Sequence, residues 1–437
     1  MDVVKNKKFN VGEAHVDITP PTGIELAGFH KPAGQERRIE GIRHTPAVRA
    51  LTLALGNTQA VLVSVDILGL PLAMTRRIDQ TIESRYGIPA TNVRLCATHT
   101  HSMPSFTYLR QWGAVPHDYM SLVEATILIA IDRALKDAAP AKLSIGSSRA
   151  VGASFNRTVK ASKTDADFNN DSTHDERWLD TLLQVLHFER GKKKSPILWY
   201  HFASHPVCYN DTQAGPDWPG LVDAHVQERF GITPSFLQGH AGDVNPGDGE
   251  HWIGKPEQSA NATFDAIVRA MNNRREVNVD SLISNSEYFG LPLDLDLYKN
   301  WQDQYAKDPA ACARGTWVDA PFAQDWYDGN HTRTITDPHQ YIQLSTLQLG
   351  PIQMAFHPAE LFSYYGLHIR HNAPTAHTLV VGYTDGLIGY LTDPASFEKE
   401  EYAAVVVPKI LDIPPYTRNA ASEMAQHLNT MLLKNFR

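Results

Sequence analysis

Apolar and polar residues alternate along the chain in segments that follow one another in the order typical of an α/β protein. Ala47–Leu55 and Ala60–Val65 have the pattern of two strands joined by a short turn. Leu72–Tyr86 has a helical pattern, and Asn92–Ala97 has the pattern of the next strand. This order predicts sheets covered by helices, with polar site residues just beyond the ends of strands.

The alternation continues along the chain without a Pro-, Gly- or Ser-rich linker and without a repeated sequence. We therefore expect one large α/β domain over residues 1–437, in which mixed β-sheets are flanked by helices and a metal site lies at strand ends. The polar and aromatic stretch 298–341 departs from the alternation, and we expect a long excursion over the surface that either binds a ligand or is a structural flap. The other expected elements are the helices Tyr119–Ala138, Leu221–Phe230 and Ala260–Asn273 and the strands Leu182–Phe188, Ile197–Ala203, Ile342–Leu349 and Ile352–His357.

Composition and charge exclude several classes of protein. Hydrophobic residues make up 42% of the 437 residues, which is enough for a buried core, and a net charge of −8 argues against nucleic-acid binding. Three cysteines without a CxxC spacing argue against a disulfide scaffold and a cysteine zinc site. No apolar run reaches the roughly 20 residues that cross a bilayer. Met1–Asn10 is polar, so we expect no signal peptide and a cytoplasmic protein as the sequence stands, or a secreted or periplasmic one if a leader has been removed.

Histidines follow two of the expected strands. His99 and His101 come directly after a buried strand, and on an extended segment two residues of this spacing project to the same side. His205 stands at the exit of a second strand, whereas His201 lies deeper in it and is expected to be buried and hydrogen-bonded. Neutral imidazole is the commonest metal ligand, so a metal site is one interpretation, and hydrogen-bonded histidines without a metal are the other.

Further polar residues stand at the ends of later elements. Glu360 is expected to open a helix, where it is either an oxygen ligand that completes a zinc set or a charge matched to the helix dipole. Arg157 lies in a loop and either clamps an oxyanion or makes a surface salt bridge. Tyr390 and Tyr402 bracket a polar turn, where tyrosines usually only pack. The glycines of 239–247 allow backbone amides to approach a ligand closely.

Taken in order, these segments resemble the neutral/alkaline non-lysosomal ceramidase family. The likeness begins at VGEAHVDITPP and continues through THTHS, FASHP, GDVNPG, PAELF and GLIGYLTDPASF, from residue 11 to about residue 405. The resemblance implies the catalytic domain of that family. It also implies that the family's C-terminal immunoglobulin-like domain is missing, because the sequence ends soon after Tyr402.

The resemblance implies a role for individual residues around a zinc ion. The two histidines, the glutamate and the tyrosine that hold the metal in the family correspond to His99, His205, Glu360 and Tyr390. The expected catalytic residues are Arg157 and Tyr402, which would stabilise an oxyanion, and His101 or Asp243, either of which would carry a proton to the leaving amine. The expected substrate-binding residues are Asn245, Asp66, Trp317 and Trp326.

One departure from the family bears on the mechanism. The family loop reads GDVSP, and its serine is often assigned to the attack on the amide, but this chain has Asn245 at that position. An amide side chain cannot form an acyl-enzyme, which favours attack by a zinc-bound water. We therefore expect a zinc-dependent hydrolase of a linear amide in an N-acyl compound, either ceramide-like or more polar, with a small-molecule substrate and no nucleic-acid partner.

Two other classes of function remain open. One is a metallohydrolase of another amide, an ester or a lactone, for instance on a (β/α)₈ barrel, although the chain does not show eight evenly spaced β-α units. The other is a ligand-binding homologue without catalysis, which the loss of the loop serine at Asn245 favours. The argument against a non-catalytic homologue is that six polar residues, which are costly to bury unpaired, are all present. They are His99, Arg157, His205, Glu360, Tyr390 and Tyr402.

Overall fold

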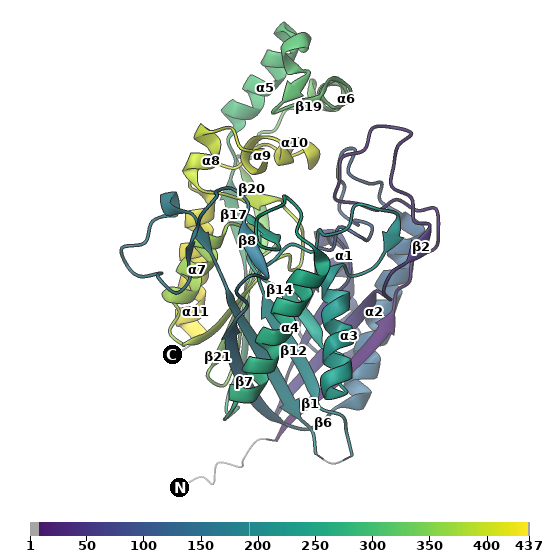
Figure 1. Cartoon of the computed structure of the whole chain (residues 1–437), viewed down its shortest axis with the longest axis vertical. Coiled ribbons are helices and arrows are strands. Elements are labelled where there is room, and N and C mark those ends of the chain that lie inside the picture. The colour runs from purple at the N-terminus through teal and green to yellow at the C-terminus, as the bar shows by residue number, and fades with distance from the viewer. Residues whose placement is uncertain (1–7, 192, 436–437) are drawn as a thin grey trace.

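The computed structural model describes residues 8–191 and 193–435. Residues 1–7, which make up most of the polar N-terminal segment in which no signal peptide is expected, lie outside the described residues. Three β-sheets pack against one another, with helices on the outside (Figure 1). Each sheet is mixed, because antiparallel strands lead into a parallel pair whose strands are joined through a helix. The expected α/β fold with mixed sheets is confirmed.

The first sheet has the strand order β5-β4-β3-β1-β6. Side chains alternate between its faces, as the period of two in a strand requires. Val61 and Val63 of β4 pack under the helices, whereas Leu62 points to the other side. Its elements are β1 (Phe9–Asp17), β3 (Ala47–Leu55), β4 (Thr58–Val65), α1 (Leu72–Tyr86), β5 (Val93–Ala97), α2 (His117–Asp137) and β6 (Ala139–Pro140).

The second and third sheets have the orders β14-β12-β11-β7-β16 and β17-β20-β21-β23. The second consists of β7 (Lys142–Arg149), β11 (Leu182–Glu189), β12 (Ile197–Phe202), α3 (Trp218–Phe230), β14 (Ser235–Gln238), α4 (Pro256–Asn273) and β16 (Arg275–Val277). The third consists of β17 (Leu282–Pro292), β20 (His339–Leu349), β21 (Ile352–Phe356), α7 (Ser363–His371), β23 (His377–Val381) and α11 (Ala420–Asn435).

One structural unit occurs three times in this arrangement. A strand, a helix and a parallel strand are followed by a second helix in β4-α1-β5-α2, β12-α3-β14-α4 and β21-α7-β23-α11. The architecture therefore contains a repeated unit although the sequence shows no repeat. Architecture depends on which positions are buried rather than on residue identity, so the three units share a pattern without sharing a sequence.

The three sheets share a central core and meet at one edge each. The faces turned away from the helices pack together through residues such as Leu62, Leu186 and Met354. At the carboxyl ends of the parallel edge strands the backbone of Gly382 donates to the carbonyl of Gln238 at 3.0 Å, and that of Ala97 donates to the carbonyl of Tyr383 at 3.1 Å. Polar groups that follow these strands are thereby brought to one place.

The aromatic stretch 298–341 is not an excursion over the surface. About half of it folds into α5 and α6, which form a lobe at the top of Figure 1 together with α9 and α10. The aromatic side chains form the core of this lobe, where Trp317 is 1% exposed and Trp326 is fully buried. Both indoles pack inside protein, so the expectation that they bind substrate is wrong for the structure as it stands. The elements are α5 (Leu295–Lys307), α6 (Ala320–Asn330), α8 (Pro394–Glu398), α9 (Tyr402–Val405) and α10 (Val407–Ile410).

Short strands connect the sheets and line the site. They are β2 (Gly41–Ile42), β8 (Ser154–Asn156), β9 (Lys163–Thr164), β10 (Trp178–Leu179), β13 (Gln213–Ala214), β15 (Val244–Pro246), β18 (Arg314–Gly315), β19 (Val318–Asp319), β22 (Glu360–Leu361) and β24 (Tyr390–Leu391). No helix within the described ranges combines the length and apolar character needed to cross a membrane.

Candidate metal centre

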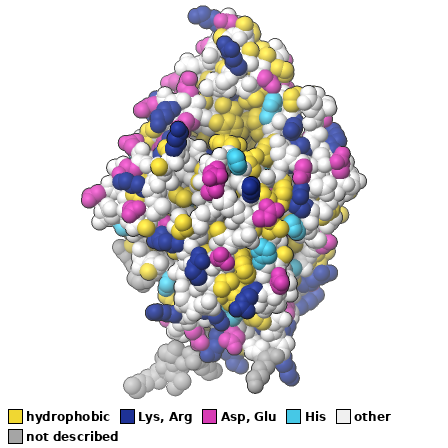
Figure 2. Space-filling model, viewed as in Figure 1, with side chains coloured by type: hydrophobic (Ala, Val, Ile, Leu, Met, Phe, Trp, Pro, Cys, Tyr) yellow, Lys and Arg dark blue, Asp and Glu magenta, His cyan; other side chains and the backbone are white. Residues whose placement is uncertain are grey.

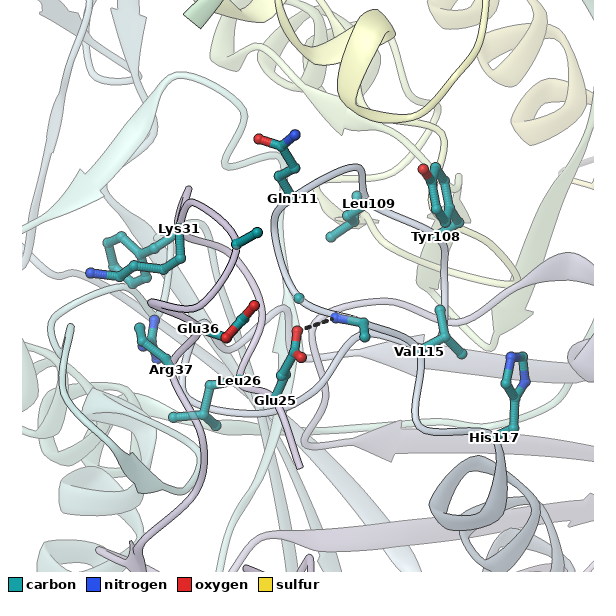
Figure 3. A pocket seen from close by; sticks show the side chains of 14 residues that line it. Glu25, Leu26, Lys31, Glu36, Arg37, Tyr108, Leu109, Gln111, Val115 and His117 are labelled. Atoms are coloured by element: carbon teal, nitrogen blue, oxygen red, sulfur yellow. Dashed lines mark hydrogen bonds between the residues drawn. The ribbon is translucent and has the colours of Figure 1, made fainter. Parts of the chain in front are cut away.

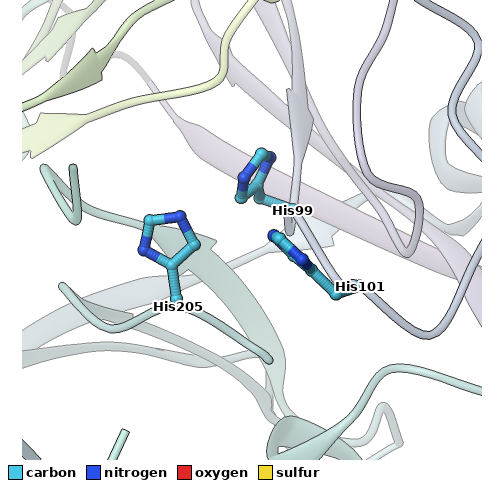
Figure 4. Close-up of side chains that lie close together, drawn as sticks. All are labelled: His99, His101 and His205. Carbon is cyan, nitrogen blue, oxygen red and sulfur yellow. The ribbon is translucent and has the colours of Figure 1, made fainter. Parts of the chain in front are cut away.

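Three histidines converge where the sheets meet. His99 and His101 follow β5 and His205 follows β12, and Figure 4 shows their imidazole rings turned toward one another. One ring nitrogen of each lies within 4.8 Å of the others, which is close enough for a common metal ion. His99 and His205 are buried, and His101 is half-buried.

The loop that carries the first two histidines is not the extended segment expected. His99 has a φ of +63°, in the left-handed region that residues with a side chain seldom adopt. The ring of Tyr383 stacks on its imidazole at 4.2 Å between centroids and holds it there. His99 and His101 still face the same site, but a turn of the backbone brings them there and not the alternation of a strand.

Backbone carbonyls fix the protonation of all three rings. The Nδ1 atoms of His99, His101 and His205 lie 2.8, 3.0 and 3.0 Å from the carbonyl oxygens of Leu68, Gly28 and Val244. A carbonyl oxygen only accepts, so each Nδ1 carries a proton and each Nε2 of a neutral ring keeps its lone pair free. Such outer contacts are typical of metal-binding histidines.

Glu360 completes the group from the segment that follows β21 of the third sheet. It does not open a helix as expected: it lies in β22, pairs with Tyr390 in β24, and α7 begins only at Ser363. Its Oε2 atom is 3.2 Å from the Nε2 atoms of both His99 and His205. In tetrahedral zinc sites with bonds of about 2.0–2.1 Å, neighbouring ligand atoms are about 3.3 Å apart.

The charges of this group fit a cation. Burial lowers the pKa of His205 to about 4 and lowers the pKa of His101 well below its ordinary value, so both rings are neutral at neutral pH. The lone pair of the His205 Nε2 atom then faces a carboxylate oxygen of Glu360, and two acceptors repel each other unless a proton or a metal ion lies between them. His99, His205 and Glu360, each of which follows a strand of a different sheet, therefore suit a divalent metal.

Arg157 and Tyr390 are joined beside these ligands. The guanidinium of Arg157 donates to the Tyr390 hydroxyl at 2.8 Å, to the carbonyl of Gly242 at 2.7 Å and to the Asn245 side chain at 3.2 Å. Burial raises the pKa of the Tyr390 phenol, and the charge of Arg157 opposes that rise. Tyr390 as the fourth ligand stays a prediction. The Nε2 atom of His101, which has no hydrogen-bond partner among the described residues, also lies close to the other two histidines.

A cavity of about 600 Å³ opens onto this group. The side of the molecule seen in Figure 2 is hollowed beneath the top lobe, where hydrophobic side chains gather. Tyr402, which begins α9 and is 45% exposed, stands in the cavity wall with its ring 6.4 Å from that of Tyr390. The lining includes His101, Arg157, Asn245, Tyr390 and Tyr402 together with the aromatic residues Phe29, Trp112, Trp252 and Phe362.

Two expected site residues lie elsewhere. Asp66 is 1% exposed and accepts hydrogen bonds from the guanidinium of Arg49 at 2.6 Å and the backbone of Ala47 at 2.9 Å, so its carboxylate holds β3 and does not face the cavity. Asp243 is equally buried, and its carboxylate accepts from Asn156 and Ser363. Asp243 therefore anchors the site loops, and its expected role as a proton carrier has no support in this geometry.

The side chain of Asn245 makes its hydrogen bonds within the protein. Its side-chain oxygen accepts from Arg157, and its nitrogen donates to the carbonyl of Trp252 at 2.6 Å. Asn245 borders the cavity, so its contact with substrate stays a prediction. Its two hydrogen bonds position Arg157 and the loop that carries Trp252.

Sequence reasoning missed Gln238, the fully buried last residue of β14. Its amide nitrogen donates to the carbonyls of Thr98 and Ser204 at 3.3 and 2.8 Å, and its oxygen accepts from the backbone of Ser204 and Gly239. Thr98 and Ser204 immediately precede His99 and His205. A glutamine directly after the apolar pair Phe236-Leu237 was the available signal.

We expect Gln238→Leu to weaken metal binding about 10- to 100-fold, because it removes the contact that sets the spacing of the two histidine loops. The buried backbone groups left unpaired also lower the free energy of unfolding by about 2–4 kcal/mol. Calorimetric titration of metal-free protein and urea unfolding measure the two effects, with Gln80→Leu, at an exposed position of α1, as control. Unchanged metal affinity in a folded variant would contradict this role.

A second cavity, of about 550 Å³, is lined by residues of the segments 25–37 and 108–117 (Figure 3). Its charged groups are largely engaged within the protein: Glu25 accepts from the backbone of Ala114 at 2.9 Å and pairs with Arg38. None of the proposed metal ligands lines it. The cavity at the histidines is therefore the better candidate site.

Three mixed sheets with histidines and a carboxylate at their junction define an α/β protein whose histidine group could hold a metal ion. The model of the neutral/alkaline non-lysosomal ceramidase N-terminal region matches residues 9–227, half of the chain. The chain belongs to this family.

Comparison with solved structures agrees on the fold. The neutral ceramidase from Pseudomonas aeruginosa is 18% identical with a TM-score of 0.73, over 98% of this chain and 74% of that one. A ceramidase complexed with C2 is also 18% identical with a TM-score of 0.74, over 98% and 75% of the two chains. A search of curated proteins found no match.

Proposed function

We propose that this protein is a zinc-dependent hydrolase of the amide bond in an N-acyl amine, with ceramide as the first compound to test. The observation that carries the proposal is the buried set of His99, His205 and Glu360, in which the Glu360 Oε2 atom lies 3.2 Å from the Nε2 atom of each histidine. Family membership supports amide hydrolysis, and the titles of the two structural relatives name ceramidases.

His99, His205 and Glu360 would hold the divalent ion, which would polarise a carbonyl group and lower the pKa of a water molecule to about 7. The side chains around it have complementary roles. Arg157 and Tyr402 stabilise the negative charge that develops on the carbonyl oxygen. His101, whose Nε2 atom is buried without a partner among the described residues, accepts a proton. Because burial lowers the pKa of His101, that proton passes readily to the leaving amine.

Asn245 makes a serine-type mechanism the weaker alternative. Its side chain cannot form an acyl-enzyme, and both ends of its amide are engaged by Arg157 and Trp252. The aromatic stretch 298–341 gives no support for a polar ligand, since its indoles are buried. The proposal therefore favours an N-acyl amine with apolar parts over a more polar amide.

The test is metal content by elemental analysis of the wild type and of His99→Ala and Glu360→Ala. We expect about one zinc per chain in the wild type and none in either variant, because each variant removes a direct ligand. Amide hydrolysis should stop with a chelator and return with zinc. His339→Ala, at an exposed position, is the matched control.

Other outcomes distinguish the alternatives. A wild type that carries no metal and takes up none from added zinc would contradict the proposal and favour the ligand-binding homologue. Zinc with hydrolysis of esters or lactones but not of amides would favour the other metallohydrolase.

A further inference from the structure

The cavity at the metal centre continues into a narrow recess. Five residues line both spaces, among them His101, Tyr390 and Tyr402, whereas His99 and Glu360 line the recess alone. The recess holds about 40 Å³ against about 600 Å³ for the outer cavity. Apart from these polar groups its wall is largely apolar, formed by Leu68, Leu109, Trp112, Leu387, Val407, Ile410 and Leu411.

The recess cannot widen easily. A methyl group placed on Gly69 would meet the Leu387 side chain at 2.5 Å, and one placed on Gly389 would meet the Leu411 side chain at 2.6 Å. Both leucines are thus already pressed against backbone. In close-packed protein, space for extra methylenes comes only from moving neighbours, which typically costs 1–3 kcal/mol.

The chemistry of the two spaces indicates which one takes the acyl group of an amide substrate and which one takes its amine. The leaving amine becomes a cation on release, and burying an isolated cation in an apolar recess is costly. The outer cavity is open and offers the polar side chains of Thr158 and Glu401. The acyl group, whose chain carries no charge, suits the recess, with its carbonyl at the metal ligands.

We propose that the recess is the acyl subsite and that the preferred substrates are N-acyl amines with short acyl groups. A water-sized group occupies about 10–15 Å³ on this measure, so the recess holds about three of them, which corresponds to acyl groups of about two to four carbons. The outer cavity takes the larger, partly apolar amine. This inference rests on the proposed amide hydrolysis.

The test compares zinc-supplemented protein on N-acyl sphingosines whose acyl groups have two, four, eight and sixteen carbons. The two shortest should have kcat/KM values within about tenfold of each other, and the two longest should fall at least about 100-fold lower. Calorimetric binding of acetate, butyrate and octanoate gives a readout independent of turnover and should weaken at octanoate.

Enlarging the recess should raise the length of the longest acyl group that the protein cleaves efficiently. Leu411→Ala and Leu387→Ala each remove three carbons from the wall, so the eight-carbon substrate should gain at least about tenfold relative to the two-carbon one. Two variants are used because either leucine also packs in a core, and Leu122→Ala, on the exposed face of α2, should leave the profile unchanged.

The outcomes separate this inference from the proposed function. Efficient cleavage of the sixteen-carbon substrate by the wild type, or a profile that neither leucine variant moves, would overturn the acyl assignment while leaving amide hydrolysis intact. Cleavage of none of the substrates would instead overturn the proposed function and this inference with it.

Discussion

Glu360→Gln should abolish metal binding and lower amide hydrolysis at least about 1000-fold, while the metal-free protein becomes as stable as the wild type or more stable. In the metal-free wild type the Glu360 carboxylate faces the His205 Nε2 acceptor at 3.2 Å. The amide nitrogen of glutamine carries two hydrogens and would donate one to each facing histidine. A neutral amide is also a poor ligand for a divalent ion.

Two measurements are needed for Glu360→Gln. Elemental analysis follows the metal, and calorimetry in excess chelator follows the unfolding temperature. Glu398→Gln, whose side chain is 64% exposed, is the control for a change of charge alone. A variant that keeps one metal per chain, or that melts several degrees below the wild type in chelator, would show that Glu360 is a structural carboxylate.

Arg157→Lys should lower kcat about 100- to 1000-fold with little change in KM. The guanidinium makes three hydrogen bonds at once, to Tyr390, Gly242 and Asn245, and still borders the cavity. A lysine keeps the charge but cannot reproduce this planar arrangement. Loss of one preorganised donor to a developing oxyanion typically costs this factor in kcat.

Steady-state kinetics of the metal-loaded protein measure the effect, and Arg418→Lys at an exposed position is the control. Added guanidinium should restore part of the rate to Arg157→Ala, because it supplies the missing group. A variant with a lower unfolding temperature but unchanged kcat would mean that Arg157 only holds the loops together.

Periodicity along the chain was sufficient to predict the repeated elements of the fold. Leu72–Tyr86 coincides with α1, and Ala47–Leu55 coincides with β3. The burial of His201 was also expected, and its Nε2 lies 2.9 Å from the carbonyl of Val380. These features depend on local patterns of apolar residues, which the sequence displays directly.

The positions of polar residues were harder to predict. Asp66 and Asp243 look like site carboxylates in a sequence, because burial in an ion pair or a hydrogen-bond network leaves no local signature. The indoles of the 298–341 stretch were expected in a surface loop, because the sequence does not show that they pack together to form the core of a separate lobe. Gln238 acts through two loops that are far apart in the sequence, and only the junction of three sheets brings it to them.

This junction has a consequence for how long the folded state persists. The candidate ligands His99, His205 and Glu360 each follow a strand of a different sheet, so a single ion closes two long loops of chain, as a pair of crosslinks would. Contacts between segments so distant in sequence tend to form late in folding. Occupancy of the site should therefore slow unfolding far more than it speeds refolding, and metal supply would set the protein's lifetime against proteolysis.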